Sequence, residues 1–395
     1  MTNLHFHAPS QVVFGPDTEK QVGSLCKQYG ARKVLIHYGG GSAVRSGLID
    51  RVKTSLEEAG LAYLTLGGVV ANPQLGLARE GIQLCKKEGV DFILAVGGGS
   101  VIDSSKCIAY GIVNEGDVWE YYARKKVPTG CAPVGSILTI AAAGSEMSNT
   151  SVITNEDGWL KRSLATSYGF CKFSILNPEL TYTVSAYQTA SGSTDIILHT
   201  LERYFVAPQT QTLTLFDGIA ETLLKTVMQY TPLALIDPKN YNARANLMWC
   251  ATFSHNDVTG DRSIGDWASH QIEHELSGMF KVAHGAGLAS IWGSWARYVM
   301  KENIDRFIQL AHNVFDIEDK VSKEYTALAG IEAMEEFFKC INMPTSIPEL
   351  IGRKLTEEEI KTLAFKCSFM GTRTVGKFKV LDIPDIEEIY RMANK

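Results

Sequence analysis

The sequence predicts an α/β domain with a parallel, Rossmann-like sheet, followed by an all-α domain. Three observations carry this prediction. Short apolar runs alternate with amphipathic segments over the first part of the chain, and two of these runs end in glycine-rich loops. After the turn signal Asn177-Pro178 the segments become long and helically periodic. We therefore expect two domains, residues 1–183 and residues 184–395, as a chain of 395 residues also favours.

The predicted elements follow from this change of periodicity. Short runs rich in β-branched and other apolar residues predict strands at residues 34–38, 61–66, 92–96, 134–140 and 173–176. Helical periodicity predicts helices at residues 101–110, 189–206, 212–229, 242–256, 267–280 and 331–340.

Composition narrows the class of protein. The net charge is −5, from 38 basic and 43 acidic residues, and no basic run indicates binding to nucleic acid or to an anionic membrane. No segment has the roughly 20 apolar residues that a membrane helix needs, and the N-terminus lacks the layout of a signal peptide. Eight scattered cysteines are typical of reduced thiols. We therefore expect a cytoplasmic protein with a small-molecule substrate.

One glycine-rich loop, Gly97-Gly98-Gly99-Ser100, follows the strand at 92–96 and opens a helix. Glycines there would let the backbone approach a diphosphate, and the helix N-terminus would supply N–H groups and a favourable dipole. Ser100 or Asp103 could cap this helix. The loop lacks the GxGxxG pattern, so by itself it indicates a tight structural turn equally well.

The loop after the strand at 34–38 bears on the choice of dinucleotide. NAD-preferring folds place an acid near the end of an early strand, where it binds the ribose 2′-hydroxyl. Here that place is taken by Gly39-Gly40-Gly41-Ser42, with Arg45 close behind. The missing carboxylate leaves room for a 2′-phosphate, so we expect NADP(H), with NAD(H) as the alternative.

A second constellation predicts a metal site. Asp195 and His199 are four residues apart, as are His270 and His274, so on helices each pair projects from one face. His284 follows ten residues later, and five of the nine histidines lie between His199 and His284. One carboxylate and several imidazoles can converge on a divalent ion. The remaining histidines are expected to pack or to lie at the surface: His5, His7, His37, His255 and His312.

One rival interpretation comes from another reaction class. The run His270-Gln271-Ile272-Glu273-His274 fits HxxEH, the helix of inverted zinc peptidases, in which Glu273 would be the general base. It would leave Asp195, His199 and the glycine-rich N-terminal half unexplained.

A set of short motifs is spread over the whole chain: Phe14-Gly15, Asn72-Pro73, Gly97-Gly98-Gly99-Ser100 with Asp103 and Lys106, Thr139 followed by Gly144-Ser145-Glu146, Asp195-x-x-x-His199, His270-x-x-x-His274 and His284-Gly285. In combination they resemble the iron-containing (group III) alcohol dehydrogenases. The resemblance is strongest to the branch of NAD(P)H-dependent butanol dehydrogenases and aldehyde reductases.

The resemblance implies roles for individual residues. Asp195, His199, His270 and His284 would bind one Fe²⁺ or Zn²⁺, and His274 would lie near the nicotinamide as a catalytic residue. The residues implied to line the dinucleotide are Gly40, Gly41, Ser42, Asn72, Gly97, Gly98, Gly99, Ser100, Asp103, Thr139, Ser148, Lys161 and Leu180. A homodimer is implied as well.

The resulting expectation is hydride transfer between NADP(H) and a primary alcohol or aldehyde, such as butanol or butanal. A glycerol-type polyol dehydrogenase and a sugar-alicycle lyase of the same fold are the alternatives. The four-ligand set and the Gly40-Gly41-Ser42 loop favour the alcohol–aldehyde interpretation.

Overall fold

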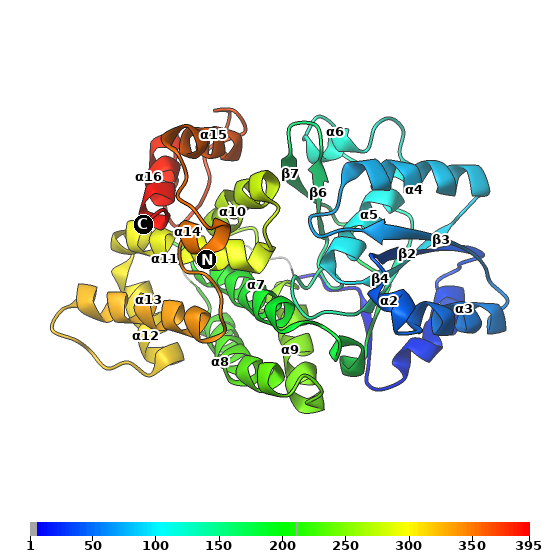
Figure 1. Cartoon of the computed structure of the whole chain (residues 1–395), viewed down its shortest axis with the longest axis horizontal. Helices are drawn as coiled ribbons and strands as arrows, with labels where there is room; N and C mark the ends of the chain where they lie inside the picture. The colour runs from blue at the N-terminus through cyan, green and yellow to red at the C-terminus, as the bar shows by residue number, and fades with distance from the viewer. Residues whose placement is uncertain (1–5, 211) are drawn as a thin grey trace. The chain divides into compact units, whose positions relative to one another are not determined.

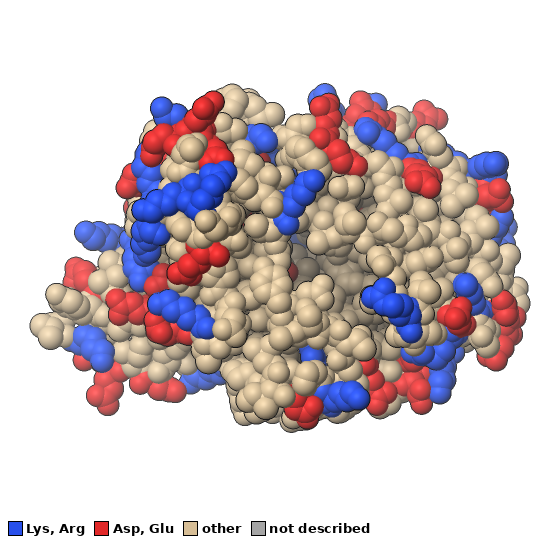
Figure 2. All heavy atoms as spheres, viewed as in Figure 1, with Lys and Arg blue, Asp and Glu red and all other residues tan. Residues whose placement is uncertain are grey.

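The computed structural model describes residues 6–210 and 212–395 and divides them into two compact units. The first unit spans residues 8–184, and the second spans residues 185–395 with Phe6 and His7. Figure 1 shows the strands of the first unit and the helices of the second. In Figure 2, the displayed face carries acidic and basic side chains close to one another.

The first unit is built on a parallel sheet. Within its described residues, six strands lie in the order β1-β8-β5-β4-β2-β3, and every neighbouring pair is parallel. The strands are β1 (Gln11–Phe14), β2 (Lys33–Gly39), β3 (Ala62–Val69), β4 (Phe92–Gly97), β5 (Val134–Leu138) and β8 (Phe173–Leu176). The predicted α/β class is confirmed. Strands β4 and β5 are buried along their whole length, as continuous apolar runs in covered parallel sheets usually are.

Short helices and one hairpin complete this unit. The helices are η1 (Thr18–Gln21), α1 (Val22–Gln28), α2 (Ser42–Arg45), α3 (Leu48–Glu58), α4 (Leu75–Glu88), α5 (Gly99–Val113), α6 (Trp119–Tyr122) and η2 (Pro178–Thr181). The antiparallel hairpin of β6 (Thr150–Asn155) and β7 (Leu160–Ala165) was not predicted, and neither was the four-residue strand β1. Helix α5 is the most buried of these helices, and it packs against β4.

The described part of the second unit is helical, as predicted. Its elements are α7 (Ala186–Tyr204), α8 (Thr214–Ile236), α9 (Tyr241–Ser254), α10 (Ala268–Phe280), α11 (His284–Val299), η3 (Met300–Glu302), α12 (Ile304–Phe315), α13 (Lys323–Cys340), α14 (Ile347–Ile351), α15 (Glu357–Cys367) and α16 (Ile383–Ala393). No helix in the described residues is long and apolar enough to cross a membrane. All eight cysteines are free thiols, and six of them are buried.

Helix α7 is the central element of the second unit. Every residue from Thr189 to Tyr204 is buried, and α8, α9, α10 and α11 pack against it. Helix α11 lies very close to α7 at Gly285, where a Cβ would overlap the carbonyl oxygen of Ser191. Only a residue without a side chain lets the start of α11 lie this close to α7.

This contact gives the first testable prediction. Replacing Gly285 by Ala forces α11 away from α7, and such overpacking typically costs about 1–3 kcal/mol of stability. We expect a melting temperature several degrees below that of the wild type, measured by calorimetry. Gly218→Ala is the matched control, because a Cβ at this exposed position of α8 meets no atom within 4 Å. The control should be neutral or up to about 1 kcal/mol more stable; equal losses in both variants would contradict the packing argument.

A buried histidine makes the first unit sensitive to acid. His37 lies on β2, with Nδ1 2.8 Å from the carbonyl oxygen of Leu66 and Nε2 2.9 Å from the hydroxyl of Ser104. Burial lowers the pKa of His37 to about 4, although the hydrogen bond to Leu66 opposes the shift. The unfolded chain therefore takes up a proton below about pH 6.5 that the folded protein does not. The contribution of neutral His37 to the free energy of unfolding is complete above about pH 6.5 and is lost as the pH falls towards 4.

We therefore expect acidification from pH 7 to pH 5 to cost the first unit roughly 2 kcal/mol through His37 alone. His37→Gln should flatten the fall of the melting temperature over this range. His312→Gln should leave it unchanged, because His312 lies at the surface beside Asp319. The same pH slope in the His37 variant and in the wild type would refute this assignment.

Candidate functional site

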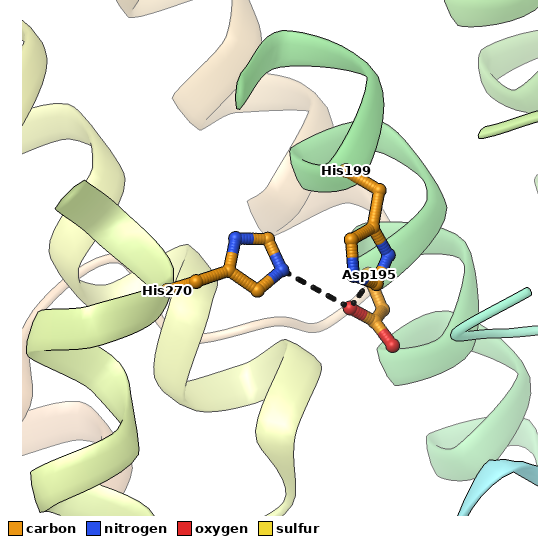
Figure 3. Close-up of side chains that lie close together, drawn as sticks. All are labelled: Asp195, His199 and His270. Carbon is orange, nitrogen blue, oxygen red and sulfur yellow. Dashed lines mark ion pairs between the residues drawn. The ribbon is translucent and has the colours of Figure 1, made fainter. Parts of the chain in front are cut away.

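The predicted metal ligands come together in the second unit. Asp195 and His199 lie one turn apart on α7, His270 lies on α10, and His284 is the first residue of α11. The Oδ1 atom of Asp195 is 3.3 Å from Nδ1 of His199, 3.7 Å from Nε2 of His270 and 3.7 Å from Nε2 of His284. Figure 3 shows Asp195, His199 and His270 pointing towards one another from two helices. One carboxylate oxygen therefore faces a nitrogen of three imidazoles.

These atoms fit a divalent cation. Asp195, His199 and His270 are at most 5% exposed, and Oδ1, Nδ1 and Nε2 of these residues have no hydrogen-bond partner among the described residues. A buried polar atom without a partner costs about 1–3 kcal/mol, so three of them facing one point need an explanation. An ion between them would satisfy all three, and one carboxylate with imidazoles is a donor set for Fe²⁺ or Zn²⁺.

The pKa values of two of these histidines shift in opposite directions. Burial, helped by the positive charges of His255 and His270, moves the pKa of His199 well below its usual value. That ring is therefore neutral and offers a lone pair, as a metal ligand must. Burial also acts to lower the pKa of His270, but the nearby carboxylates of Asp195 and Glu202 outweigh it and raise this pKa to about 9, so a cation bound at Nε2 would displace a proton from this ring.

The remaining motif histidine has different neighbours. His274 belongs with Glu273 and His284 to a second group of potential ligands, and its ring centroid is 5.6 Å from that of His284. Within this group the carboxylate of Glu273, which is fully buried, contacts Nδ1 of His284 and accepts a hydrogen bond from Ser277. In the peptidase interpretation this carboxylate would instead have to face a catalytic water.

Two residues at this site were not predicted. The ring centroid of His255, just after α9, lies 4.2 Å from that of His199, so this histidine packs against a candidate ligand. Glu202 accepts a hydrogen bond from the backbone of His270 and lies 3.0 Å from its Nδ1. A signal for Glu202 was present in the sequence, because residues 195, 199 and 202 share one helix face. No sequence pattern pointed to His255.

Most of the predicted dinucleotide residues follow the carboxyl ends of strands of the six-stranded sheet in the first unit. The chain passes from β2 outward to β3 and then returns to β4 on the other side of β2, so the strand order reverses between β2 and β4. Open α/β sheets bind ligands at the carboxyl ends of strands at such a switch point. The two glycine-rich loops follow these two strands. The residues after β3, β5 and β8 on the same edge are Asn72, Thr139 and Leu180.

The loop after β4 has little room for side chains. A Cβ at Gly98 would overlap Ile140, and one at Gly99 would lie 3.1 Å from Ala143. Thr139 donates its N–H to the carbonyl oxygen of Gly97, which ties the loops after β4 and β5 together. The backbone of this loop is therefore the surface that a ligand would meet.

The predicted capping of α5 by Ser100 or Asp103 is wrong. The helix starts at Gly99 with Gly98 as its N-cap, and no side chain caps it. Asp103 instead accepts the N–H of Val152, and burial raises its pKa to about 6. A helix end without an acidic cap is better suited to a phosphate group.

The segment that contains Ser148 is held by a buried lysine. The ammonium of Lys106 donates to the carbonyl oxygens of Ser145, Ser148 and Thr150. Lys106 is completely buried, so its role is to fix this segment on α5. Lys161, the remaining predicted residue, lies on β7, where it pairs with Thr154 of β6.

After β2, Gly41 has φ of +116° and is the N-cap of α2. The guanidinium of Arg45 bends back towards it, 3.0 Å from where a Cβ of Gly41 would lie. A Cβ at Gly40 meets no atom within 4 Å. The loop therefore combines a positive charge with open space.

Comparison with known proteins identifies the family. Residues 9–178 match the family model of iron-containing alcohol dehydrogenases, and residues 189–394 match that of the C-terminal part of Fe-containing alcohol dehydrogenases. A probable NADH-dependent butanol dehydrogenase of Bacillus subtilis is 36% identical over the full length of both chains. The NADPH-dependent aldehyde reductase YqhD of Escherichia coli is 32% identical, also over both full chains.

The fold agrees with these sequence matches. The crystal structure of an NADH-dependent butanol dehydrogenase A from Thermotoga maritima superimposes with a TM-score of 0.94 at 36% identity, covering 100% of this chain and 99% of the other. The peptidase interpretation is therefore wrong, and the resemblance inferred from the motifs is confirmed. The chain belongs to the iron-containing alcohol dehydrogenase family.

Proposed function

We propose that this protein is a metal-dependent alcohol dehydrogenase and aldehyde reductase that transfers a hydride between NADP(H) and a primary alcohol or aldehyde, such as butanol or butanal. The observation that carries the proposal is the Oδ1 atom of Asp195, which faces a nitrogen of His199, His270 and His284. These four residues would hold one Fe²⁺ or Zn²⁺.

The chemistry divides between the bound groups and the chain. When bound, a divalent ion would act as a Lewis acid on the oxygen of the substrate. A nicotinamide supplies or accepts the hydride. Asp195 is the only negatively charged residue of the four ligands, so a divalent ion with these ligands would keep a charge of about +1 to act on that oxygen. His274 is assigned to positioning the nicotinamide or relaying a proton, as a catalytic residue outside the ligand set.

The dinucleotide is assigned to the first unit. The backbone of Gly97, Gly98 and Gly99, together with Ser100 in the first turn of α5, would bind the diphosphate. Asp103 would contribute to the dinucleotide site only indirectly, because its carboxyl accepts a hydrogen bond from the backbone N–H of Val152. Asn72, Thr139, Ser148, Lys161 and Leu180 would line the remainder.

The coenzyme proposed is NADP(H), with NAD(H) as the alternative. Relatives are named for both coenzymes: the Bacillus subtilis protein for NADH and the Escherichia coli protein for NADPH. In this chain the loop after β2 has Gly40, Gly41 and Ser42 where an acid would exclude a 2′-phosphate. Arg45 adds a positive charge beside that loop.

We also propose a cytoplasmic homodimer. Free thiols at all eight cysteines suit a reducing compartment. Strand β1 is at the edge of the sheet, and an edge strand offers unpaired backbone groups to a second copy of the chain.

The coenzyme assignment is tested at Gly40, where a side chain fits without a clash. Gly40→Asp would place a carboxylate against the 2′-phosphate, where the two negative charges repel each other. We expect kcat/KM with NADPH to fall roughly 10–100-fold relative to kcat/KM with NADH. Gly40→Asn, of the same size but neutral, is the control and should change this ratio much less. A wild type that prefers NADH would contradict the assignment without any variant.

The metal assignment is tested by separating ligands from neighbours. His270→Ala removes a ligand, so the metal content after purification should fall. Turnover of butanal should fall more than 100-fold, since roughly 100-fold is the most that loss of a hydrogen bond to a ligand usually costs. His274→Ala should slow turnover but keep the metal, measured by elemental analysis on protein purified without air. Loss of metal in the His274 variant would make that residue a ligand. Faster turnover of dihydroxyacetone than of butanal would favour the polyol alternative.

A further inference from the structure

We infer that Glu202 and Glu273 are positioning residues of the proposed metal site. Each carboxylate holds the Nδ1 atom of one ligand histidine, so that the Nε2 atom of the same ring is turned towards Asp195. The inference rests on the proposed function only in taking Asp195, His199, His270 and His284 as the ligands.

The first pair is Glu202 with His270. Oε1 of Glu202 is 2.9 Å from the backbone nitrogen of His270 and 3.0 Å from its Nδ1, so one oxygen accepts from both. The opposite nitrogen of the ring, Nε2, is the atom that lies 3.7 Å from Asp195 and has no hydrogen-bond partner in the described residues. Asp195, His199 and Glu202 are all on α7, so this helix supplies two of the proposed ligands and fixes the ring of a third.

The second pair is Glu273 with His284. Oε2 of Glu273 contacts Nδ1 of His284, and Oε1 accepts the hydroxyl hydrogen of Ser277. Again Nε2 of the ring faces Asp195, at 3.7 Å. The backbone makes room for this carboxylate, because a Cβ at Gly287 would overlap Oε1 of Glu273. A glycine one turn after His284 thus leaves space for the group that orients it.

The physical consequence is the same for both rings. A neutral imidazole carries one proton, and a carboxylate at Nδ1 keeps the proton there and leaves the lone pair on Nε2. The negative charge of the glutamate also makes the lone pair on Nε2 a stronger electron donor to a cation. Glu202 and Glu273 are 2% and 0% exposed, so water does not weaken either interaction.

This pairing also explains why Glu273, His274 and His284 lie close enough together to form a second group of potential ligands. If Glu273 orients His284, the group is not a separate metal site, and one ion per chain is expected. The carboxylate in the HxxEH run then acts through a histidine and not as a general base.

The experiment uses the full chain stripped of metal and titrated with Zn²⁺ against a coloured chelator. Glu202→Gln and Glu273→Gln keep the size of each side chain but remove the charge, and each should weaken Zn²⁺ binding about 10–100-fold. In the Co²⁺-loaded protein, the visible absorption bands should shift in both variants, since they report the ligand field.

Glu335→Gln is the matched control. Glu335 is a buried glutamate of the second unit that makes two hydrogen bonds to Arg297 and is not among the residues that contact the ligand histidines. Its loss should lower the melting temperature while the Zn²⁺ affinity and the Co²⁺ bands stay as in the wild type. If Glu273→Gln does not fold, Glu273→Asp, which keeps the charge but shortens its reach, should show a smaller shift of the same kind.

Wild-type affinity and wild-type Co²⁺ bands in both glutamate variants would overturn the inference while leaving the metal site intact. Two Zn²⁺ ions per wild-type chain, falling to one in Glu273→Gln, would also overturn it, because Glu273 would then be a ligand. A wild-type chain that binds no Zn²⁺, Fe²⁺ or Co²⁺ would overturn the proposed function itself.

Discussion

The organisation of the second unit depends on one carboxylate oxygen, Oδ1 of Asp195, in a helix that is buried on all sides. Helix α7 carries Asp195, His199 and Glu202 through the interior, where an ionised group without partners costs several kcal/mol. Glu202 finds its partner in His270. For Oδ1 of Asp195 the neighbours are three ring nitrogens that no single proton can satisfy together. The proposed cation resolves this conflict, because it attracts the carboxylate and accepts the lone pairs at the same time.

In both units, the candidate sites are formed where side chains are missing. Gly285 lets α11 approach the backbone of α7, and Gly287 leaves space for the carboxylate that contacts His284. In the first unit, Gly98 and Gly99 bring backbone against the loop after β5, so that N–H groups rather than side chains form the surface. A methyl group at these positions would displace whole elements, because packed interiors have few voids to absorb it. These glycines therefore allow the close packing that places the metal-site side chains and the backbone N–H groups, although they contribute no side chain themselves.

Much of this arrangement could be predicted from the sequence, and the failures share a cause. The strands at residues 92–96 and 134–140 were recognisable because continuous apolar runs reflect burial on both faces. Asp195 with His199 was recognisable because a spacing of four fixes the relation of two side chains on one helix. The prediction that Ser100 or Asp103 caps α5 was wrong. The Asp103 carboxylate instead accepts a hydrogen bond from the backbone N–H of Val152, which is far away in sequence. The contacts of His255 with His199 depend likewise on how separate helices pack. Local spacing predicts pairs within an element, whereas contacts between elements require the tertiary structure.

The HxxEH run shows why a motif needs its structural context. The same five residues fit a peptidase helix, yet here the carboxylate of Glu273 lies between Ser277 and His284, in a chain whose family is that of dehydrogenases. Its chemistry is set by its neighbours, because a fully buried carboxylate that contacts an imidazole has no water to activate. The same holds for the proposed coenzyme loop, since relatives named for NADH and for NADPH share one fold. The ligand set at residues 195–284 and the loop at residues 39–45 lie in different units. If the loop at residues 39–45 binds the coenzyme as proposed, coenzyme preference can change through a few loop residues while the proposed metal chemistry is left untouched.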